Sequence, residues 1–542
     1  MDESAGRTKV DWRPWGAAAF EEAATSGKPV LLSLVAPWSA RCRQMDAGAF
    51  SVPTVAANVN EEFVPVRVDA DRRPRVRERY NVGGFPSTVF LTPTGERIAS
   101  AGYLGAESVR GVLDRVRETW AEKRGDAGRV PRALRDGTPP EGALTPDVER
   151  LVAGQLGAQY DERFGGWGTS EKFPLPRTVE FALKRERGQA LRTLDAVRRT
   201  LADDADGGFY RFAHARDWSD PQREKLLETN AGLLRAFASA YLYTGREAYR
   251  EAAADALDYL SGTLWTGAAF AGSQFPGEHS GRPPAEREAD AESDVDATAH
   301  AEKNARAADA LLTYAAYTDD EAATRYGERA LTYLAETLVD ANGRVRRYDA
   351  ADAPTGLLAD HAAVTRAFAR GAQVLDPGHA ETAALVADRA VETLQDGAFR
   401  DGPVERVGLL DRPLYPVDDN AEMAHALLEL AELVGGDAYR EAARSALRAF
   451  AGAADRMGVQ VADYAAAASR LVERPLTVRV GAPVGSDLHR AALRIADHEK
   501  VVVPAATDVD GDAAVVVVGG TRHGPARDPE SLASLIADRA DG

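Results

Sequence analysis

The sequence contains a single cysteine, Cys42, among its 542 residues. A disulfide framework, a Cys-x-x-Cys redox pair and a zinc site made of thiolates each need at least two cysteines in one chain. One cysteine therefore excludes all three within this polypeptide. The spacings His-x-His and His-Glu-x-x-His are missing as well, so we expect no bound metal and no cofactor.

Long apolar runs are also missing. The longest aliphatic run, AAVVVV at residues 513–518, is far shorter than the ~20 residues that span a bilayer. The first ten residues, MDESAGRTKV, hold no apolar segment of the kind that directs secretion. We therefore expect a cytoplasmic protein that has no membrane partner.

Lysine is scarce: the chain has 8 lysines beside 58 arginines, and its 84 acidic residues outnumber its 66 basic ones, for a net charge of −18. Such a surplus of negative charge repels a phosphate backbone, so we expect no nucleic-acid partner. A dense acidic surface also suits strong salt, where the Debye length falls to about 3 Å. We interpret the pattern as halophilic adaptation, and GC-rich coding is the alternative explanation for the arginines.

The length predicts two or three domains, since it is about three to four times the commonest domain size. Residues 1–122 mix strand and helix patterns, and residues 123–144 are rich in glycine, proline and charge, as in a linker. Residues 145–474 are almost entirely helical. Residues 475–542 alternate short strands with one or two helices, which predicts a small α/β appendage.

The helical zone repeats one unit six times. Each unit is a helix, a long loop with a glycine before apolar or aromatic residues, a second helix and a short polar turn. The long loops lie at residues 165–168, 206–212, 267–272, 342–348, 396–402 and 457–463. Twelve helices in six hairpins, with every long loop on one side, predict an all-α (α/α)6 toroid. The alternative is an open helical solenoid, which would show more uniform repeats.

A polar residue recurs at the start of four of the second helices. Asn230, Asn304, Asp360 and Asn420 each precede apolar residues at helical spacing, so each lies on the buried stripe. On inner helices, the four would point toward the axis on the long-loop side. An unpaired buried amide costs about 1 to 3 kcal/mol, so each needs a partner. We predict a funnel that binds a ligand, and the alternative is that these residues cap helices or fasten loops.

Groups suited to acid–base chemistry lie close to these positions. Glycosidase chemistry needs two carboxyl groups about 5 to 10 Å apart across a sugar, and epimerase chemistry needs bases on opposite faces. The candidate catalytic groups are Glu224, Asp360 and Glu422. The candidate ligand-binding groups, besides the three asparagines, are Lys225, His361 and Trp218, the last either stacking on a sugar or covering the core.

The first domain resembles the thioredoxin fold. A strand over residues 29–35 leads into a helix after APWSARC at residues 36–42, and GGFPSTVFL at residues 83–91 puts Pro86 where such domains keep a cis-proline. Ser39 stands in the place of the first cysteine of the redox motif and Cys42 in the place of the second.

A lone thiol cannot form an intramolecular disulfide, so we do not expect a dithiol oxidoreductase. We interpret Cys42 as a small core residue. The alternative is a monothiol whose pKa is lowered by the neighbouring Arg41 and Arg43.

Motifs along the whole chain, together with the order of its domains, resemble the spermatogenesis-associated protein 20 family. The matching stretches include Gly84-Phe85-Pro86, Lys172-Phe173-Pro174, Gly207-Gly208-Phe209, and Trp218 followed by Glu224, Lys225 and Asn230. The resemblance implies a thioredoxin-like domain before a toroid similar to N-acylglucosamine 2-epimerases and six-hairpin glycosidases. The family's Cys-His-Trp-Cys-His reads Ser39-Ala40-Arg41-Cys42-Arg43 in this chain, which makes it a divergent member.

Two functions follow as hypotheses. In the first, the toroid binds a sugar-like or other polar small molecule and acts as an isomerase or hydrolase of carbohydrate metabolism through Glu224, Asp360 and Glu422. In the second, the protein is a noncatalytic interaction or folding-assistance protein, whose thioredoxin-like face grips an extended client protein across Pro86.

Overall fold

The structure, a computed structural model, describes residues 8–135, 137–276 and 295–540. Its internal contacts divide the chain into two compact units. Unit 1 comprises Met1–Thr138 and Asp401–Leu414, and unit 2 comprises Pro139–Arg400 and Tyr415–Gly542. The first boundary lies within the segment 123–144 that the composition marks as a linker. No sequence pattern predicts that residues 401–414 return to unit 1.

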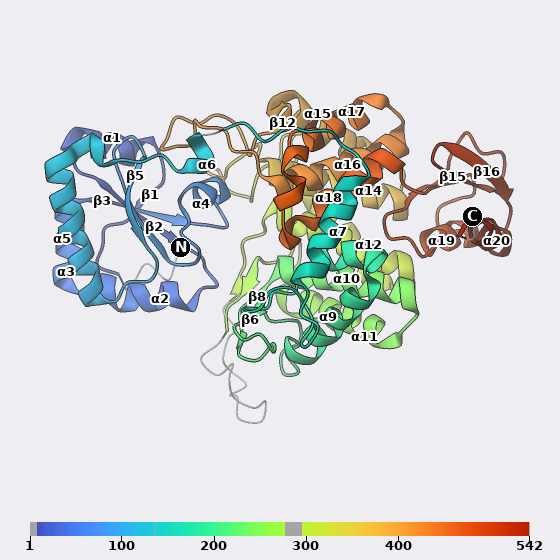
Figure 1. The fold of residues 1–542 in the computed structure, drawn as a ribbon, viewed down its shortest axis with the longest axis horizontal. Coiled ribbons are helices and arrows are strands. Elements are labelled where there is room, and N and C mark those ends of the chain that lie inside the picture. The colour runs from blue at the N-terminus through green and yellow to red at the C-terminus, as the bar shows by residue number, and fades with distance from the viewer. Residues whose placement is uncertain (1–7, 136, 277–294, 541–542) are drawn as a thin grey trace. The chain divides into compact units, whose positions relative to one another are not determined.

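Unit 1 is built on a five-stranded sheet in the order β1-β3-β2-β4-β5 (Figure 1). Strands β1 and β2 are parallel to β3, and β4 and β5 are antiparallel to their neighbours. The strands are β1 Arg13–Pro14, β2 Val30–Val35, β3 Val64–Asp69, β4 Ser87–Leu91 and β5 Arg97–Ala101.

Alternate residues of the central strand β2 enter two different cores, as the period of two in a strand requires. Leu32 and Leu34 pack with residues of helices α1 and α4, whereas Leu31 packs with residues of α2, α3 and α5. The sheet therefore lies between two helical layers, which is the α/β domain expected from the sequence. The helices are α1 Ala17–Ser26, α2 Ala40–Ala47, α3 Pro53–Glu62, α4 Pro74–Tyr80, α5 Ala106–Lys123 and the short α6 Arg132–Arg135.

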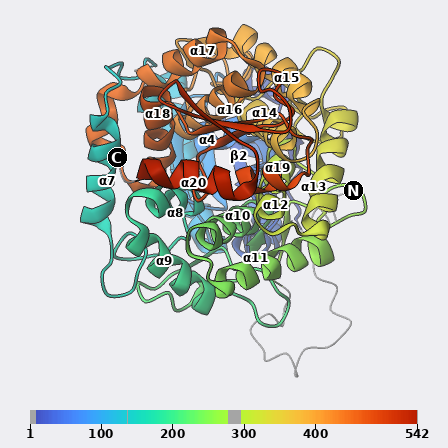
Figure 2. The same ribbon diagram turned by 90° about the vertical axis from the view of Figure 1, so that its right-hand side faces the viewer.

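Twelve helices of unit 2 form two concentric rings (Figure 2). The inner helices contact one another in sequence order, and the last contacts the first, so the ring is closed. The inner ring comprises α8 Pro176–Arg185, α10 Leu227–Thr244, α12 Ala301–Thr318, α14 Leu358–Val374, α16 Val417–Val434 and α18 Ala462–Glu473. The outer ring comprises α7 Asp147–Gln159, α9 Arg187–Thr200, α11 Glu247–Tyr259, α13 Glu321–Tyr333, α15 His379–Leu394 and α17 Asp437–Arg448.

The predicted toroid is therefore observed, and the open solenoid is not. The inner helices are buried on nearly every side: α12 and α14 have alanines all around their circumference, which lets neighbouring helices approach closely. Every long loop leads into the N-terminus of an inner helix, so the long loops gather on one side, which we call the mouth. These loops carry the short strands β6 Phe212–Ala213, β7 Pro221–Gln222, β8 Lys225–Leu226, β9 Ser273–Gln274, β10 Val295–Asp296, β11 Gln395–Asp396 and β12 Ala398–Phe399.

The appendage of unit 2 lies against the C-terminal ends of the inner helices. Its sheet has the order β14-β13-β15-β16, and β14 contacts α14 and α16. Gln373, in the last turn of α14, accepts a hydrogen bond from Val502 N–H at 3.0 Å and, through its carbonyl, one from His489 Nε2 at 2.9 Å. The elements are β13 Thr477–Val480, α19 Asp487–Leu493, β14 Val501–Val503, β15 Ala514–Val518, β16 Thr521–Ala526 and α20 Pro529–Ala540.

Among the helices described by the structure, none combines the length and the apolarity needed to cross a bilayer.

Candidate functional site

Three of the four recurring polar residues fasten the loops of the mouth. Each is the fourth residue of its inner helix and is fully buried. Its Oδ1 accepts the N–H of a phenylalanine in the preceding loop at 2.7 to 2.8 Å, and its Nδ2 donates to that phenylalanine's carbonyl at 3.0 to 3.1 Å. Nδ2 also donates to the carbonyl four residues earlier. The pairs are Asn230 with Phe209, Asn304 with Phe270, and Asn420 with Phe399.

This geometry corresponds to the loop-fastening alternative. A side-chain amide offers two donor hydrogens and one acceptor oxygen, and all of these groups are engaged by the chain's own backbone. A ligand would have to break these buried hydrogen bonds before it could bind an amide. We therefore do not retain Asn230, Asn304 and Asn420 as ligand-binding groups.

The fourth member of this series is His361 and not Asp360. His361 is the fourth residue of α14, and its Nδ1 donates to the carbonyl of Leu357, four residues earlier, at 2.8 Å. Burial lowers the pKa of the ring to about 4, so the imidazole is neutral at pH 7. The sequence pattern placed the series one residue too early in this helix, because Asp360 and His361 are adjacent and both polar.

Asp360 belongs to a different contact. Its Oδ1 accepts from Arg347 Nη1 at 2.7 Å and from Glu302 N–H at 3.2 Å, and Arg347 also pairs with the carboxylate of Glu302 at 2.7 Å. Asp360 Oδ2 has no hydrogen-bond partner among the described residues. Burial raises the pKa of Asp360 above its usual value.

Glu224 and Lys225 are adjacent in the chain, but their side chains make different contacts. Lys225 binds Asp203 Oδ2 at 2.7 Å and the carbonyl of Gly207 at 2.6 Å, so it secures the loop before α10. Glu224 is buried: one oxygen accepts from Gln222 Nε2 at 3.0 Å, and burial raises its pKa. Within the described residues, no hydrogen bond or ion pair joins Glu224 to Asp360 or Glu422.

Trp218 covers the core and does not form a platform for a sugar. Its side chain is 1% exposed, and its indole N–H donates to the carbonyls of Phe164 at 3.1 Å and Gly165 at 3.3 Å. A Cβ at Gly166 would lie 2.6 Å from the indole ring, so the loop glycine lies directly against it. This burial favours the alternative that Trp218 covers the core.

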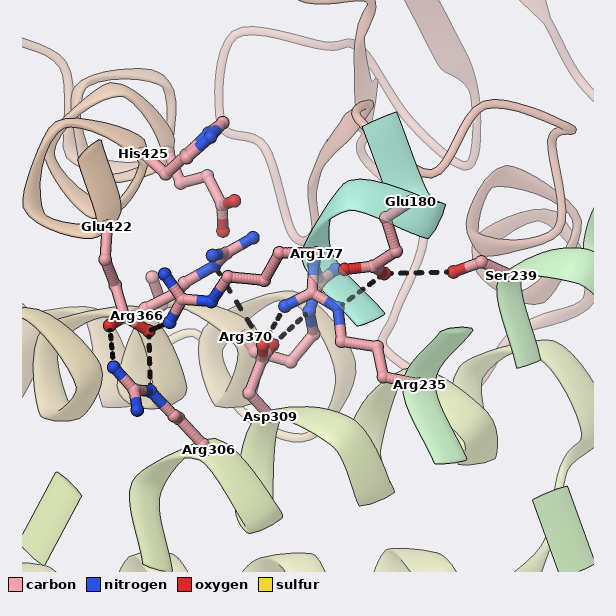
Figure 3. Close-up of polar contacts among 12 residues, drawn as sticks. Arg177, Glu180, Arg235, Ser239, Arg306, Asp309, Arg366, Arg370, Glu422 and His425 are labelled. Carbon is pink, nitrogen blue, oxygen red and sulfur yellow. Dashed lines mark hydrogen bonds and ion pairs between the residues drawn. The ribbon is translucent and has the colours of Figure 1, made fainter. Parts of the chain in front are cut away.

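Glu422 is the sequence-predicted carboxylate that lies at the centre of the mouth. Arg177 on α8 and Arg306 on α12 approach its two oxygens from opposite sides, each at 2.6 Å (Figure 3). The two guanidinium groups lower the pKa of Glu422 to about 2 despite its burial. Both arginines keep a partly exposed side chain, 29% for Arg177 and 24% for Arg306, so donors around this carboxylate remain within reach of solvent.

The ion pair between Asp360 and Arg347 is connected to Glu422 through other ion pairs. Arg306 pairs with Glu302 as well as with Glu422, and Glu302 in turn pairs with Arg347, which holds Asp360. Glu422 and Asp360 are therefore two ends of one network of ion pairs, which joins α12, α14 and α16 with Arg347 of the loop before α14. Glu224 is not part of this network, and a shared ligand site for the three carboxylates stays a prediction.

Asp419 is the group that sequence reasoning missed. It lies three residues before Glu422 on α16, and its side chain is half-buried. Burial, together with the carboxylates of Glu302, Glu422 and Asp418, raises the pKa of Asp419 to about 8, against the opposing effect of Arg306. The signal available in the sequence was the spacing Asp419-x-x-Glu422, which puts both carboxyl groups on one helix face.

Further along the axis, side chains from the six inner helices form buried ion pairs. Glu180, Arg235, Asp309 and Arg370 are drawn in Figure 3. Asp309 pairs with Arg235 and with Arg370, the latter at 3.1 Å, and Arg235 also binds Glu180 at 3.0 Å. Glu429 pairs with Arg470 at 3.1 Å. These pairs lie between the inner helices and are largely shielded from solvent.

His425 connects the mouth to this network. Its Nε2 lies 3.1 Å from Asp463 Oδ1, and its Nδ1 accepts from Arg470 Nη1 at 2.8 Å. Asp463, at the start of α18, also pairs with Arg177, so it lies at the rim of the mouth. His425 lies three residues after Glu422 on α16, so the two side chains share one face of that helix (Figure 3).

A surface cavity of about 560 Å³ lies elsewhere, between α9 and α11. Aspartates and glutamates dominate its lining, which includes Asp204, Glu251, Asp255 and Asp258. None of the candidate catalytic carboxylates lines it. Among the described residues there is also no group of three or more histidine, cysteine, aspartate or glutamate side chains arranged to hold a metal ion.

The thioredoxin-like residues lie together in unit 1. Ser39 precedes α2, and its Oγ donates to the carbonyl of Phe85 at 3.4 Å, next to the cis bond between Phe85 and Pro86. Cys42 is 5% exposed, and burial raises the pKa of its thiol to about 11. Burial and not Arg41 or Arg43 sets this pKa, so the interpretation of Cys42 as a core residue is the one that fits.

The chain is similar to known proteins in sequence and in fold. Residues 3–136 match the family Thioredox_DsbH, described as a protein of unknown function, DUF255. Human spermatogenesis-associated protein 20 is 30% identical over 294 residues, which are 47% of this chain and 37% of the human protein. The rat protein of the same name is 29% identical over the same length. The resemblance predicted from the sequence is thus confirmed over these residues, and the chain spans about a third of the length of these relatives.

Solved structures similar to the chain are distant in sequence. Cellobiose 2-epimerase from Spirochaeta thermophila is 17% identical, with a TM-score of 0.47 over 63% of this chain and 98% of that one. D-mannose isomerase is 10% identical, with a TM-score of 0.47 over 60% of this chain and 98% of that one.

Proposed function

We propose that the mouth of the toroid binds a sugar-like, polar small molecule and carries out acid–base chemistry on it, as an isomerase or a hydrolase. The observation that supports this proposal is the contrast between Asp419 and Glu422. The pKa of Asp419 is raised to about 8 and that of Glu422 is lowered to about 2, although both lie on one face of α16. Two carboxyl groups whose surroundings separate their pKa values in this way have the arrangement of an acid and a charged partner.

Asp419 is the proton-carrying group in this proposal. A general acid or base is most effective when its pKa lies near the working pH, and a carboxyl group with a pKa of about 8 is protonated at pH 7. It can therefore donate a proton to a glycosidic or carbonyl oxygen. After that transfer, Asp419 is a carboxylate of sufficient basicity to take a proton from a hydroxyl, a water molecule or an acidic carbon.

Glu422 has a different part, because a carboxylate with a pKa of about 2 is a weak base. It remains charged throughout, and the guanidinium groups of Arg177 and Arg306 neutralise its charge. It also holds the partly exposed side chains of Arg177 and Arg306, whose N–H groups could donate to hydroxyl or carbonyl oxygens of a ligand. Asp360 supports this arrangement through Arg347, Glu302 and Arg306.

The charges around the mouth are mixed. Glu302 and Arg306 face it from α12, Asp418 and Asp419 from α16, and Asp463 from α18. Alternating charges with several donors and acceptors suit a ligand that is rich in hydroxyl groups. A carbohydrate is the common ligand of this chemistry, in line with the link that the family resemblance implies.

The test is calorimetric titration and turnover of a panel of mono- and disaccharides with the full chain. The variants are Asp419→Asn and Glu422→Gln, and the control is Asp437→Asn, an exposed aspartate at the start of α17. We expect binding of at least one sugar, turnover reduced at least about 100-fold by Asp419→Asn, and no change in the control. Silence across the panel, or binding and turnover that neither site variant alters, would contradict the proposal.

Noncatalytic client binding at the thioredoxin-like face is the second candidate function. The raised pKa of Cys42 supports a role without thiol chemistry for this unit. The cytoplasmic location and the salt adaptation of the protein stay predictions from the sequence.

A further inference from the structure

Residues 401–414, which we call the strap, leave the chain of the toroid between β12 and α16 and form part of unit 1. Asp401 N–H donates to the carbonyl of Leu414 at 2.9 Å, so the two ends of the strap meet. A surface segment of this length whose ends are adjacent is an Ω-loop, a compact element that docks as a piece.

Two arginines of α4 form ion pairs with the carboxylate at one end of the strap. Arg75 Nε lies 2.9 Å from Asp401 Oδ2, and Arg79 Nη1 lies 2.6 Å from the same oxygen. All three residues are buried, with exposures of 6% for Arg75, 3% for Arg79 and 6% for Asp401. Since residues four apart lie on one side of a helix, the two guanidinium groups form a single receptor for this carboxylate.

The same two arginines also bind the backbone of the strap. Arg75 donates to the carbonyls of Pro403 at 2.6 Å and Leu410 at 3.0 Å. Arg79 donates to the carbonyls of Leu409 at 2.9 Å and Arg412 at 2.7 Å. The carbonyl groups of a loop are not paired within a strand or a helix. Once they are buried, they therefore need hydrogen-bond donors such as these arginines.

The apolar part of the strap completes a core of unit 1. Leu409 and Leu410 are each 3% exposed and pack in the cluster that contains Trp15 and Tyr80. Tyr80 Oη accepts from Leu409 N–H at 3.1 Å and donates to the carbonyl of Gly95 at 2.8 Å. Burial of two leucines is worth about 3 to 6 kcal/mol of gross stabilisation, so the core is incomplete without the strap.

A glycine permits this docking. Gly408 has a φ of 58°, and a Cβ at this position would lie 2.9 Å from the ring of Trp15 and from Tyr80 Oη. Both the backbone conformation and the close approach therefore exclude a side chain. The strap has a shape, a buried charge and an apolar pair that match one surface of the thioredoxin-like unit.

We propose that the surface formed by α4, Trp15 and Tyr80 is a peptide-binding surface whose occupant is the strap, and that this occupancy makes the two units unfold as one. The proposal goes beyond the function proposed for the mouth and does not depend on it. Unit 1, whose thiol is buried, would then bind a peptide segment, and this function needs no thiol.

The test is differential scanning calorimetry of the full chain with Gly408→Ala. The control is Gly397→Ala, which has a similar φ of 73° but whose Cβ would meet nothing within 4 Å. We expect one cooperative transition for the wild type and for the control, and two separate transitions for Gly408→Ala. Two transitions in the wild type, or one in Gly408→Ala at the temperature of the control, would overturn the proposal.

A second arm adds a synthetic peptide of residues 401–414. We expect it to bind the Gly408→Ala chain, in which the surface is vacant, and to raise the transition temperature of unit 1 without merging the two transitions, because a separate peptide restores the core but does not connect the units. The wild type should not bind it. Failure to bind Gly408→Ala would contradict the peptide-binding claim.

A second variant covers the case in which Gly408→Ala does not fold. Asp401→Asn removes the charge between Arg75 and Arg79, and Asp411→Asn changes an exposed aspartate of the same strap. We expect hydrogen exchange of the strap amides to rise at least about 100-fold in the first and to stay at the wild-type rate in the second. Equal exchange in both would overturn the proposal.

Discussion

Arg306 Nη2 lies 2.6 Å from Glu422 Oε2, and this contact joins α12 to α16, two inner helices that α14 separates in the ring. Glu422 is 2% exposed, so its charge depends on the arginines that face it. The contact therefore has consequences both for stability and for the chemistry that the mouth can support.

The first prediction concerns the free energy of unfolding of Arg306→Met. This change leaves the buried carboxylate of Glu422 with Arg177 as its remaining arginine, and removal of one partner from a buried pair costs about 3 to 5 kcal/mol. Because Arg306 is partly exposed, we expect a loss of about 2 to 3 kcal/mol in urea unfolding. Arg444→Met, at an exposed arginine paired with Glu441, should change stability by less than about 0.5 kcal/mol. Equal effects of the two changes would contradict this role.

The second prediction concerns the pH dependence of stability that Glu422 contributes. Its pKa is lowered from 4.5 to about 2 in the folded protein, so the stabilisation is complete above pH 4.5 and is lost as the pH falls through about 2. The stability difference between the wild type and Glu422→Gln should therefore shrink between pH 4.5 and pH 2. A difference that is constant over this range would show that the charge of Glu422 is not responsible.

The third prediction separates fastening from ligand binding. Asn304→Ala removes three buried hydrogen bonds and leaves the N–H of Phe270 without its acceptor. We expect a loss of about 2 to 4 kcal/mol in thermal or urea unfolding. Asn342→Ala, at an exposed loop asparagine, should have no measurable effect. A stable Asn304→Ala chain with altered ligand affinity would restore the ligand-binding interpretation.

The fourth prediction concerns Cys42. Since the pKa of its thiol is raised to about 11, the folded protein should react with a thiol reagent at pH 8 at least about 100 times more slowly than the unfolded chain. The reduction of insulin disulfides should be absent in the wild type and unchanged in Cys42→Ser. Rapid labelling of the folded protein would show a reactive thiol instead.

The architecture was accessible from the sequence because it is a matter of periodicity. Six loops with a glycine before an apolar residue, each between two helical stretches, specify hairpins, and hairpins with all long loops on one side close into a toroid. The sheet of unit 1 and the appendage were equally readable from short apolar runs between turns.

The site was less accessible because it depends on contacts between distant helices. Asn230, Asn304 and Asn420 share a buried position, and the sequence could not show that a loop backbone satisfies them. Asp419 looks like an ordinary aspartate in the first turn of a helix until Glu302, from a helix more than a hundred residues earlier, is placed beside it. The strap contains only local loop signals, and its place in unit 1 results from Arg75 and Arg79, over 300 residues away.

The central claim is that Asp419 holds a proton at neutral pH, and infrared difference spectroscopy of the wild type against Asp419→Asn measures this directly. In the wild type, we predict a protonated-carboxyl band that persists at pH 7 and is lost with a midpoint near pH 8, and we predict that Asp419→Asn lacks it. If the difference spectrum shows only a carboxylate band at pH 6 and above, Asp419 is an ordinary surface aspartate and the proposed chemistry of the mouth is wrong.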